Sequence, residues 1–212
     1  MAFPTSPSNN QVHSESGSNR TYVYDSTLGV WDQVKEAQSD ISNIAGHISK
    51  EVTGFTGIKE ADQWRLHTSV STSGSSYLTL TSNWERNDTV GAGNLLGGGG
   101  TESSGVFSFP STGRWLVEFT ARTRAAGDSR PWGEALVECA TDGASYTTAA
   151  ETTWNYYTNS SYASGTTNFL VDVTNIAKYK VRVRMRADNT IEIYGSSSKN
   201  YTFFSFLRLG DT

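Results

Sequence analysis

Residues 64–212 alternate between apolar and polar side chains in ten short runs, and this alternation constrains the fold more than any other feature of the sequence. Successive side chains of a strand point to opposite sides, so such runs are typical of strands buried on one face. Segments rich in glycine, serine, aspartate and asparagine separate the runs, and no helical stretch lies between them. The pattern predicts a β-sandwich or jelly roll. The expected strands are residues 64–71, 77–83, 105–109, 114–123, 132–140, 145–149, 167–173, 179–187, 190–194 and 201–209.

The segment SGVFSFPSTGRWLVEFTAR, residues 104–122, shows this alternation most clearly. Two phenylalanines alternate toward one face before Pro110, which interrupts the strand because it has no amide hydrogen to donate. Gly113 allows the turn to close, and aromatic residues then resume the alternation on the next strand. We therefore expect these side chains to form the centre of a core. The predicted core signature consists of Phe107, Phe109, Pro110, Gly113, Trp115 and Phe119.

The composition favours a β protein and argues against two classes of partner. Aromatic residues make up 12% of the chain and charged residues only 18%, and aromatic rings pack well on a pleated, half-buried sheet surface. The formal net charge of −4 provides no general attraction to nucleic acid or to an anionic membrane. No apolar run approaches the roughly 18 residues that a membrane span needs. We expect no nucleic-acid partner and no membrane insertion.

The first residues and the single cysteine indicate where the protein is made and how it is stabilised. MAFPTSPSNNQ has neither a basic region nor an apolar stretch, so we expect no signal peptide and synthesis in a cytoplasm. Cys139 is the only cysteine of the chain, so no intramolecular disulfide can form. Its position in an alternating run predicts a buried, unreactive thiol. Stability must then come from another source, for which trimerisation is the obvious candidate.

Residues 30–52 change from a two-residue alternation to a helical period. Their apolar residues recur in steps of four and three, which is the heptad spacing of a coiled coil. One interpretation is an amphipathic helix that lies on the domain. The other is a parallel self-associating bundle, because isoleucine at both core positions favours more than two chains. We expect residues 30–63 to form a short trimeric coiled-coil stalk and linker. Its core residues are predicted to be Val30, Val34, Ala37, Ile41, Ile44 and Ile48.

Residues 1–29 form a polar leader that we expect to be extended. Prolines keep the residues before them out of a helix, residues 21–25 predict one short strand, and the segment has too little apolar surface for a core of its own. The leader is either a disordered tail or a docking segment that becomes ordered on a partner, and its aromatic residues favour docking. The predicted docking residues are Phe3, Pro4, Pro7, Tyr22, Tyr24 and Trp31.

The sequence offers little support for catalysis. Its three histidines lie in different parts of the chain, and no cysteine–histidine spacing indicates a zinc site or an activated nucleophile. Glu118 and Glu138 are the candidate pair for a glycosidase, with solvated strand carboxylates as the alternative. The glycine run at residues 97–100 predicts a flexible loop. We therefore expect a protein that is not an enzyme and that has neither a cofactor nor a metal.

Two segments are candidates for recognition. ETTWNYYTNSSYASG, residues 151–165, predicts a loop in which amphipathic rings lie beside small polar groups, a composition suited to binding. These rings either cover a subunit interface, contact a receptor or glycan, or contact another protein of the same assembly. The run KYKVRVRMR places arginines on one strand face, which is either an exposed or inter-subunit face or a site for an anionic glycan. The candidate receptor contacts are Trp154, Tyr156, Tyr157 and Tyr162, and the arginines are Arg182, Arg184 and Arg186.

The core segment GVFSFPSTGRWLVEF resembles the signature of the complement-q globular head within the tumour necrosis factor superfamily, with a Gly-x-Phe start, a Pro-x-x-Gly turn and an aromatic strand. The closing segment NYTFFSFLRLG is similar to the aromatic last strand of that family, with Ser205 where the family usually has glycine. The resemblance covers residues 64–212. It implies a ten-stranded jelly-roll β-sandwich that assembles as a tight parallel homotrimer, a symmetry with which the heptad spacing agrees.

The leader carries a second resemblance. AFPTSPSNNQVHSESGSNRTYVYDSTLGVWDQV is similar to a short module of fibre and appendage proteins of tailed bacteriophages, with Phe-Pro-x-x-Pro, a polar turn, Tyr-x-Tyr-Asp and a Gly-x-Trp ending. This resemblance implies a virion structural protein that docks through its N-terminus, either as a tail fibre or as a head fibre or decoration protein.

Together these patterns predict a homotrimeric, non-enzymatic appendage on the virion surface, made in the host cytoplasm. Its partners would be further copies of itself, capsid or tail proteins of the virion, and a host-surface glycan or receptor. Two alternatives remain open: a bacterial complement-q-like surface or adhesin protein, and a depolymerase of host polysaccharide.

Overall fold

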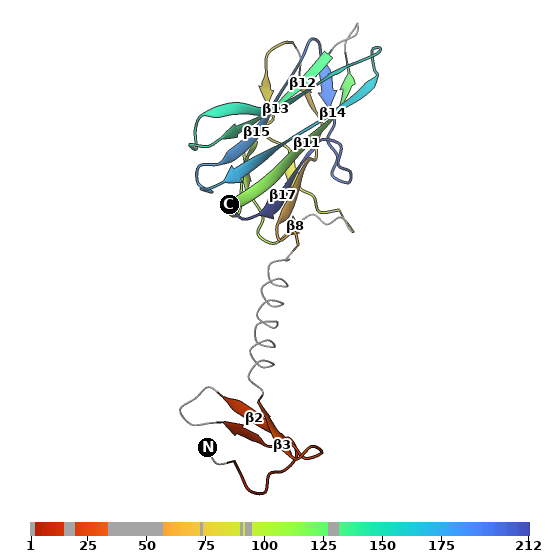
Figure 1. Ribbon diagram of the computed structural model, residues 1–212. Helices are drawn as coiled ribbons and strands as arrows, with labels where there is room; N and C mark the ends of the chain where they lie inside the picture. Colours follow the sequence, from red (N-terminus) through yellow and green to blue (C-terminus); the bar gives the residue numbers. More distant parts are fainter. Residues whose placement is uncertain are drawn as a thin grey trace. The chain divides into compact units, whose positions relative to one another are not determined.

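The computed structural model describes residues 3–14, 20–33, 57–72, 74–89, 91, 95–126 and 132–212. The chain divides into two compact units, Met1–Gly57 and Ile58–Thr212 (Figure 1). Five of the six residues predicted for the core of the stalk lie outside the described residues. They are Val34, Ala37, Ile41, Ile44 and Ile48.

The first unit contains a three-stranded antiparallel sheet in place of an extended leader. Its strands are β1 (Val12–Ser14), β2 (Thr21–Asp25) and β3 (Val30–Gln33), in the order β1-β2-β3. In the turn after β2, the Asp25 carboxylate accepts N–H bonds from Thr27 and Leu28 at 2.7 and 3.2 Å. Gly29 completes this turn with a φ of +67°, which an L side chain rarely adopts. Val30 then pairs with Asp25, so the predictions of an extended leader and of a helical stalk that begins at Val30 are wrong.

Aromatic residues hold this small sheet together on one face. The rings of Phe3 and Trp31 stack with centroids 5.2 Å apart, and Tyr22 meets Phe3 edge-on at the same distance. His13 lies 5.2 Å from Phe3, and Tyr24 lies 5.3 Å from Trp31. The sequence did not reveal this cluster, because its members come from three strands and from the segment before them.

The second unit is a sandwich of two antiparallel sheets (Figure 1). One sheet contains β6 (Leu78–Thr79), β9 (Glu102–Ser103), β10 (Val106–Ser108), β12 (Trp132–Ala140), β13 (Tyr146–Asn155) and β15 (Lys180–Ala187). The other contains β4 (Ala61–Leu66), β5 (Val70–Thr72), β7 (Trp84–Arg86), β8 (Leu95–Leu96), β11 (Gly113–Ala125), β14 (Tyr162–Val173), β16 (Ile191–Ile193) and β17 (Phe203–Gly210). The prediction of a mainly β sandwich is confirmed.

The strand order places β11 at the centre of the eight-stranded sheet. That sheet runs β5-β16-β11-β17-β4-β7, with β14 also paired to β11 and β8 to β4. The six-stranded sheet runs β13-β12-β15-β10-β9, with β6 also paired to β15. β11 is long enough to pair with β14 along one edge and with both β17 and β16 along the other. Its side chains therefore reach most of the sheet.

Several predicted strand boundaries differ from the structure. The predicted strand 64–71 is two strands, because β4 ends at Leu66 and β5 begins at Val70. The predicted loop 151–165 is largely strand, since β13 continues to Asn155 and β14 begins at Tyr162. The short strands β7, β8 and β9 were not predicted, because two or three residues carry too little alternation to be recognised.

The core between the two sheets is built largely from aromatic rings. Phe107 lies with its ring centroid 4.9 Å from that of Phe204 and 5.1 Å from that of Trp84. On β11, Trp115, Val117 and Phe119 are buried, while Leu116 and Glu118 between them face outward. Phe109 is also buried and packs against Trp115 at 5.4 Å. These four aromatic residues of the segment 104–122 thus lie in one core.

Gly113, at the first position of β11, meets a requirement of the backbone. Its φ is +139°, and a Cβ atom built there would lie 2.5 Å from the carbonyl oxygen of Gly210. Only glycine fits this position without strain, because real Cβ atoms do not approach an oxygen so closely. The glycine therefore lets β17 pass directly beside the start of β11.

The glycine run at residues 97–100, predicted to be a flexible loop, is exposed at Gly97 and Gly98 and packed against its neighbours at Gly100. Gly100 is buried, and its N–H donates to the Asp62 carboxylate at 3.0 Å. The Arg86 guanidinium donates to the Gly100 carbonyl at 2.7 Å and to the same carboxylate at 2.9 and 3.1 Å. A Cβ atom on Gly100 would lie 2.3 Å from the carbonyl oxygen of Ser108. Gly100 therefore serves close packing of the backbone.

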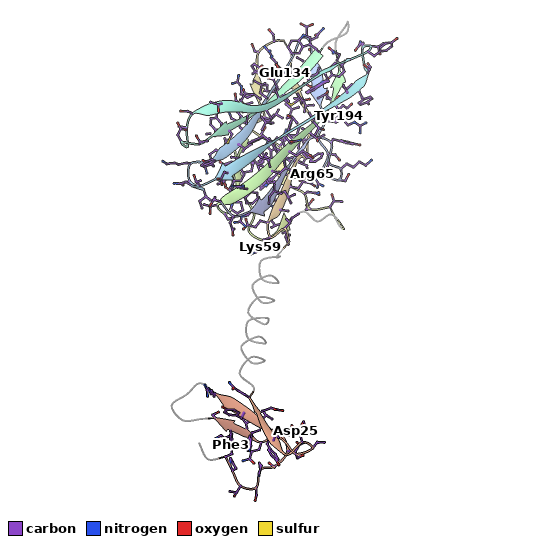
Figure 2. The ribbon with its side chains drawn as sticks, in the orientation of Figure 1. Phe3, Asp25, Lys59, Arg65, Glu134 and Tyr194 are labelled. Atoms are coloured by element: carbon purple, nitrogen blue, oxygen red, sulfur yellow. The ribbon has the colours of Figure 1, made fainter. Side chains whose placement is uncertain are left out.

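Arg65 on β4 is a completely buried arginine (Figure 2). Its guanidinium donates to Glu85 at 2.7 Å, to Asn87 at 2.8 Å and to Asp88 at 2.6 Å, and also to the carbonyl of Ser197. A buried cation needs such complete pairing, because desolvation disfavours its charge. Through these bonds Arg65 ties β4 to two segments: the segment after β7, which contains Asn87 and Asp88, and the segment before β17, which contains Ser197.

Trp154 links the ends of three strands. A Cβ atom on Gly133 of β12 or on Gly165 of β14 would lie 2.5 Å from its indole ring, so the ring fills the space between two glycines. The indole N–H donates to the Tyr156 hydroxyl at 2.8 Å, and that hydroxyl donates to Thr123 on β11. Burial raises the pKa of the Tyr156 phenol, so the hydroxyl stays protonated and can donate. This packing explains why both strands extend into the predicted loop.

Gly165→Ala tests the packing around Trp154, with Gly210→Ala as the matched control. Both glycines lie in strands of the same sheet, but a Cβ atom on Gly210 meets nothing within 4 Å. We expect Gly165→Ala to lower the free energy of unfolding by about 1–3 kcal/mol, the usual effect of overpacking. Gly210→Ala should change it by no more than about 0.5 kcal/mol. Urea unfolding followed by tryptophan fluorescence measures both, and equal stability of the two variants would contradict this packing.

Candidate interaction surface

The outward face of the eight-stranded sheet is ordered in rows that cross four strands. Leu116 of β11 pairs with Leu170 of β14 and with Leu207 of β17, and Leu207 pairs with Ala61 of β4. We call these four residues the leucine row. Leu170 is 69% exposed, which is unusual for a large apolar side chain at the middle of a strand. Leu209, further along β17, is 53% exposed. The row is therefore a partly exposed apolar stripe, in which Leu170 is open to solvent and the other three residues are half-buried.

The next row along β11 is polar. Glu118 pairs with Asn168 of β14 and Ser205 of β17, and Ser205 pairs with Gln63 of β4. The Gln63 side chain donates to the Ser205 hydroxyl at 2.9 Å. A shallow hollow spans both rows between Leu116, Glu118 and Ser205. Within the described part of the chain Glu118 has no ion-pair partner, so the centre of this face carries one carboxylate among neutral side chains.

At the Ala125 end of β11, three tyrosine rings surround an arginine on the same face. The Arg122 guanidinium lies 4.5 Å from the ring centroid of Tyr201, 5.2 Å from that of Tyr162 and 5.9 Å from that of Tyr194. The hydroxyls of Tyr162 and Tyr194 are 3.4 Å apart, and Tyr162 is 56% exposed. We call these four residues the tyrosine cage; Tyr194 is labelled in Figure 2.

The outward face of the six-stranded sheet differs, because its charges pair with one another. Arg182 and Arg184 of β15 donate to the two oxygens of Glu138 on β12 at 2.7 and 2.9 Å. Arg186 donates to Glu134, which also accepts the Tyr77 hydroxyl at 2.8 Å. Figure 2 labels Glu134 on this sheet. Both carboxylates are buried beneath the arginines, and we call these ion pairs the arginine ladder.

Aromatic rings complete the arginine ladder. The Arg182 guanidinium lies 3.9 Å from the ring centroid of Tyr146, and Arg184 and Arg186 lie 4.6 and 4.5 Å from that of Tyr77. Each guanidinium thus has a carboxylate and a ring as neighbours. Burial, together with the hydrogen bond to Glu134, raises the pKa of the Tyr77 phenol. The ladder is a partly exposed strand face whose charge is largely compensated, which leaves little attraction for an anionic glycan.

The predicted receptor contacts separate into two pairs. Trp154 and Tyr156 are buried in the sandwich, so the prediction that they contact a receptor is wrong; their rings pack between strands that the sequence pattern did not place together. Tyr157 is 81% exposed and Tyr162 is 56% exposed. Of the four residues, only these two present a ring to the surface of the described chain.

The two glutamates considered as a glycosidase pair do not meet. Glu118 lies on the outward face of the eight-stranded sheet, and Glu138 lies on the outward face of the other sheet, bound by two arginines. The core separates them, whereas paired catalytic carboxylates must flank one glycosidic bond. Among the residues that the structure describes, no group of three or more His, Cys, Asp or Glu side chains is placed to hold a metal ion. The described chain also has no helix long and apolar enough to cross a membrane.

The burial of Cys139 on β12 agrees with its expected lack of reactivity. Its thiol lies inside the sandwich, and burial raises its pKa to about 11. Since the thiolate is the reactive form, the thiol stays protonated and inert near neutral pH.

Comparison with solved structures identifies the fold. The structure of Eiger TNF from S. frugiperda superposes with a TM-score of 0.54 and 14% sequence identity, over 74% of this chain and 96% of that one. The crystal structure of murine APRIL at pH 8.0 superposes with a TM-score of 0.50 and 13% identity, over 71% of this chain and 98% of that one. No protein-family model and no curated protein matches the sequence. The chain therefore contains a TNF-like jelly roll, and at these identities the likeness concerns the fold alone.

Sequence reasoning missed the leucine row and, apart from Tyr162, the tyrosine cage. Alternation along β11 predicts that Leu116, Glu118 and Arg122 point away from the core, but it does not reveal their neighbours on other strands. Those neighbours follow from register, as Leu170 and Leu207 show. The cage draws its tyrosines from β14, from the residue after β16 and from the segment before β17. No signal within a single segment could have found it.

Glu138→Gln tests the arginine ladder, with Glu192→Gln as the control. Glu138 is buried and binds two arginines, whereas Glu192 is part-exposed and lies 3.8 Å from Arg124. We expect Glu138→Gln to lower the free energy of unfolding by about 1.5–3 kcal/mol, because charged hydrogen bonds are lost. Glu192→Gln should cost less than about 1 kcal/mol. Thermal unfolding at low and at moderate salt measures both, and a neutral Glu138→Gln would contradict a stabilising role for the ladder.

Proposed function

We propose that this protein is a homotrimeric, non-enzymatic structural protein on the virion surface of a tailed bacteriophage. In this proposal the N-terminal unit docks on a capsid or tail protein of the virion. The jelly roll forms an outer knob that binds the host surface or reinforces the capsid. The protein would act as a tail fibre, a head fibre or a decoration protein, with no cofactor.

The leucine row is the observation that best supports the proposed self-association. Three leucines and an alanine cross four strands on the open face of the sheet, and Leu170 and Leu209 are more than half exposed. Burying such a stripe against further copies gains roughly 25 cal/mol for each Å² removed from water. A TNF-like fold and the sequence resemblance to a family of trimers support threefold symmetry. The stripe would then lie in the contact between copies.

The first unit supports docking. It is a compact unit separate from the jelly roll, and its sequence resembles the docking module of phage appendages. Phe3, Tyr22 and Trp31 are half-buried in a sheet of only three strands, and an isolated sheet of this size is marginally stable in water. A partner that covers the aromatic face would stabilise it. Pro4 follows Phe3 directly, and both Pro4 and Pro7 precede β1.

The charge distribution supports a protein partner or a glycan over nucleic acid and membrane. The net charge is −4, and the arginines of the arginine ladder are paired with carboxylates. A nucleic-acid surface requires unpaired cations in series. We therefore propose neither a nucleic-acid partner nor membrane insertion.

The proposal is tested on purified phage particles whose gene for this protein encodes either the full chain or a chain without residues 3–33. We expect the full chain to be detected in purified particles by mass spectrometry and on their surface by immunogold electron microscopy. The shortened chain should be made in infected cells but absent from particles, because the deletion removes the docking unit. A control deletion within the turn 141–145, which joins β12 and β13 of the six-stranded sheet, should leave incorporation unchanged. Absence of the full chain from particles, or normal incorporation of the shortened one, would refute the proposal.

A further inference from the structure

The tyrosine cage contains a cation, Arg122, that has no counter-ion among the residues that the structure describes. Of the ten arginines in the described residues, three have no carboxylate partner, namely Arg20, Arg114 and Arg122, and only Arg122 lies among aromatic rings; the other seven pair with a carboxylate. They are Arg65, Arg86, Arg124, Arg182, Arg184, Arg186 and Arg208. The Arg122 guanidinium has neither a carboxylate nor any other side-chain or backbone acceptor among the residues that the structure describes, and its neighbours are the three tyrosine rings. Its N–H donors remain available to a ligand.

The surroundings of Arg122 hold it in place without consuming its donors. Its backbone N–H donates to the Thr202 hydroxyl at 3.2 Å, and its carbonyl accepts the N–H of Tyr194 at 2.9 Å. Arg124, two residues further along β11, lies 3.8 Å from Glu192 and donates to Ser160, so the Glu192 carboxylate pairs with that arginine. A guanidinium on fixed backbone between rings loses little conformational freedom when it binds an anion.

We propose that the tyrosine cage binds an anionic saccharide, in which the carboxylate or phosphate of a sugar accepts hydrogen bonds from Arg122 and the sugar ring packs on Tyr162. The planar fork of a guanidinium matches the two oxygens of a carboxylate or phosphate. Tyrosine presents an apolar face to the C–H groups of a sugar and a hydroxyl to its polar groups. Exposed Tyr162 and the hydroxyl of Tyr194 supply both beside the cation.

The tyrosine cage is distinct from the surface proposed for self-association. Leu116 and Arg122 are six residues apart on β11, which corresponds to about 20 Å along a strand. A contact between copies at the leucine row therefore leaves room for a ligand at the other end of the sheet. The competing interpretation is that the cage itself is a contact between copies, because tyrosine and arginine are also enriched at protein interfaces. The experiment must separate these two interpretations.

This inference rests on the proposed function in one respect, since it names the chemistry of the host surface that the knob would bind. The test uses the purified full chain and three probes in isothermal titration calorimetry: trigalacturonate, its fully methyl-esterified and hence uncharged form, and glucose 6-phosphate. We expect the ester to bind at least tenfold more weakly than trigalacturonate. Preference for trigalacturonate would assign a uronic-acid ligand, and preference for glucose 6-phosphate a sugar phosphate.

Variants separate the site from other surfaces. Arg122→Gln should weaken binding of the preferred probe at least tenfold, and Tyr162→Ala should weaken it several-fold. Arg114→Gln is the matched control, because Arg114 lies on the same face at the other end of β11, and it should leave binding unchanged. Sedimentation of each variant reports assembly. Tyr162→Ala, at an exposed side chain, provides the test if Arg122→Gln does not fold.

Equal binding of the charged and esterified probes, absence of binding by any of the three, or unchanged binding by Arg122→Gln would overturn the inference. So would dissociation of the oligomer by Arg122→Gln, which would identify the tyrosine cage as a contact between copies. None of these results depends on whether the protein occurs in virions. Failure of the saccharide site and failure of the virion proposal are therefore distinguishable.

Discussion

The pairing of β11 with strands on both of its edges is the constraint on which the second unit depends. It aligns alternate residues of β14, β17 and β4 with those of β11, so each row across the sheet points wholly inward or wholly outward. Inward rows carry Trp115 and Phe119 into the aromatic core. Outward rows place leucines at one end of the face and the tyrosine cage at the other. A shift of one residue would exchange core and surface together.

The two outward faces of the sandwich differ in whether their charged and apolar side chains are paired or buried within one chain. On the six-stranded sheet, the buried carboxylates of Glu134 and Glu138 are neutralised by arginines that rings in turn cover. That face is complete within one chain. On the eight-stranded sheet, Leu170 is open to solvent, and Arg122 lacks a counter-ion within the described residues. We therefore expect partners to bind the outward face of the eight-stranded sheet. On that face a single copy leaves the apolar side chain of Leu170 exposed and the charge of Arg122 unpaired within the described residues.

Alternation within a segment predicted much of this fold, because the inward and outward positions of a strand are a local property. The residues of segment 104–122 that alternate toward one face, such as Phe107 and Trp115, do lie in the core. Contacts between distant segments could not be predicted in this way. The sequence predicted a loop around Trp154. The glycines that enclose its ring, Gly133 and Gly165, come from other strands, so the local pattern did not show that the ring is packed. The heptad spacing appeared to begin at Val30, which instead pairs with Asp25 in the small N-terminal sheet.

The most direct test of the proposed contact surface is hydroxyl-radical footprinting of the full chain at micromolar concentration, read by mass spectrometry at single residues. In one copy Leu170 is 69% exposed and Ile176, in the turn that follows β14, is 44% exposed, so an isolated chain would be oxidised faster at Leu170. If copies associate through the leucine row, Leu170 will be protected and the order of the two rates will reverse. Faster oxidation of Leu170 than of Ile176 would show that this face is open to solvent and would contradict self-association through it.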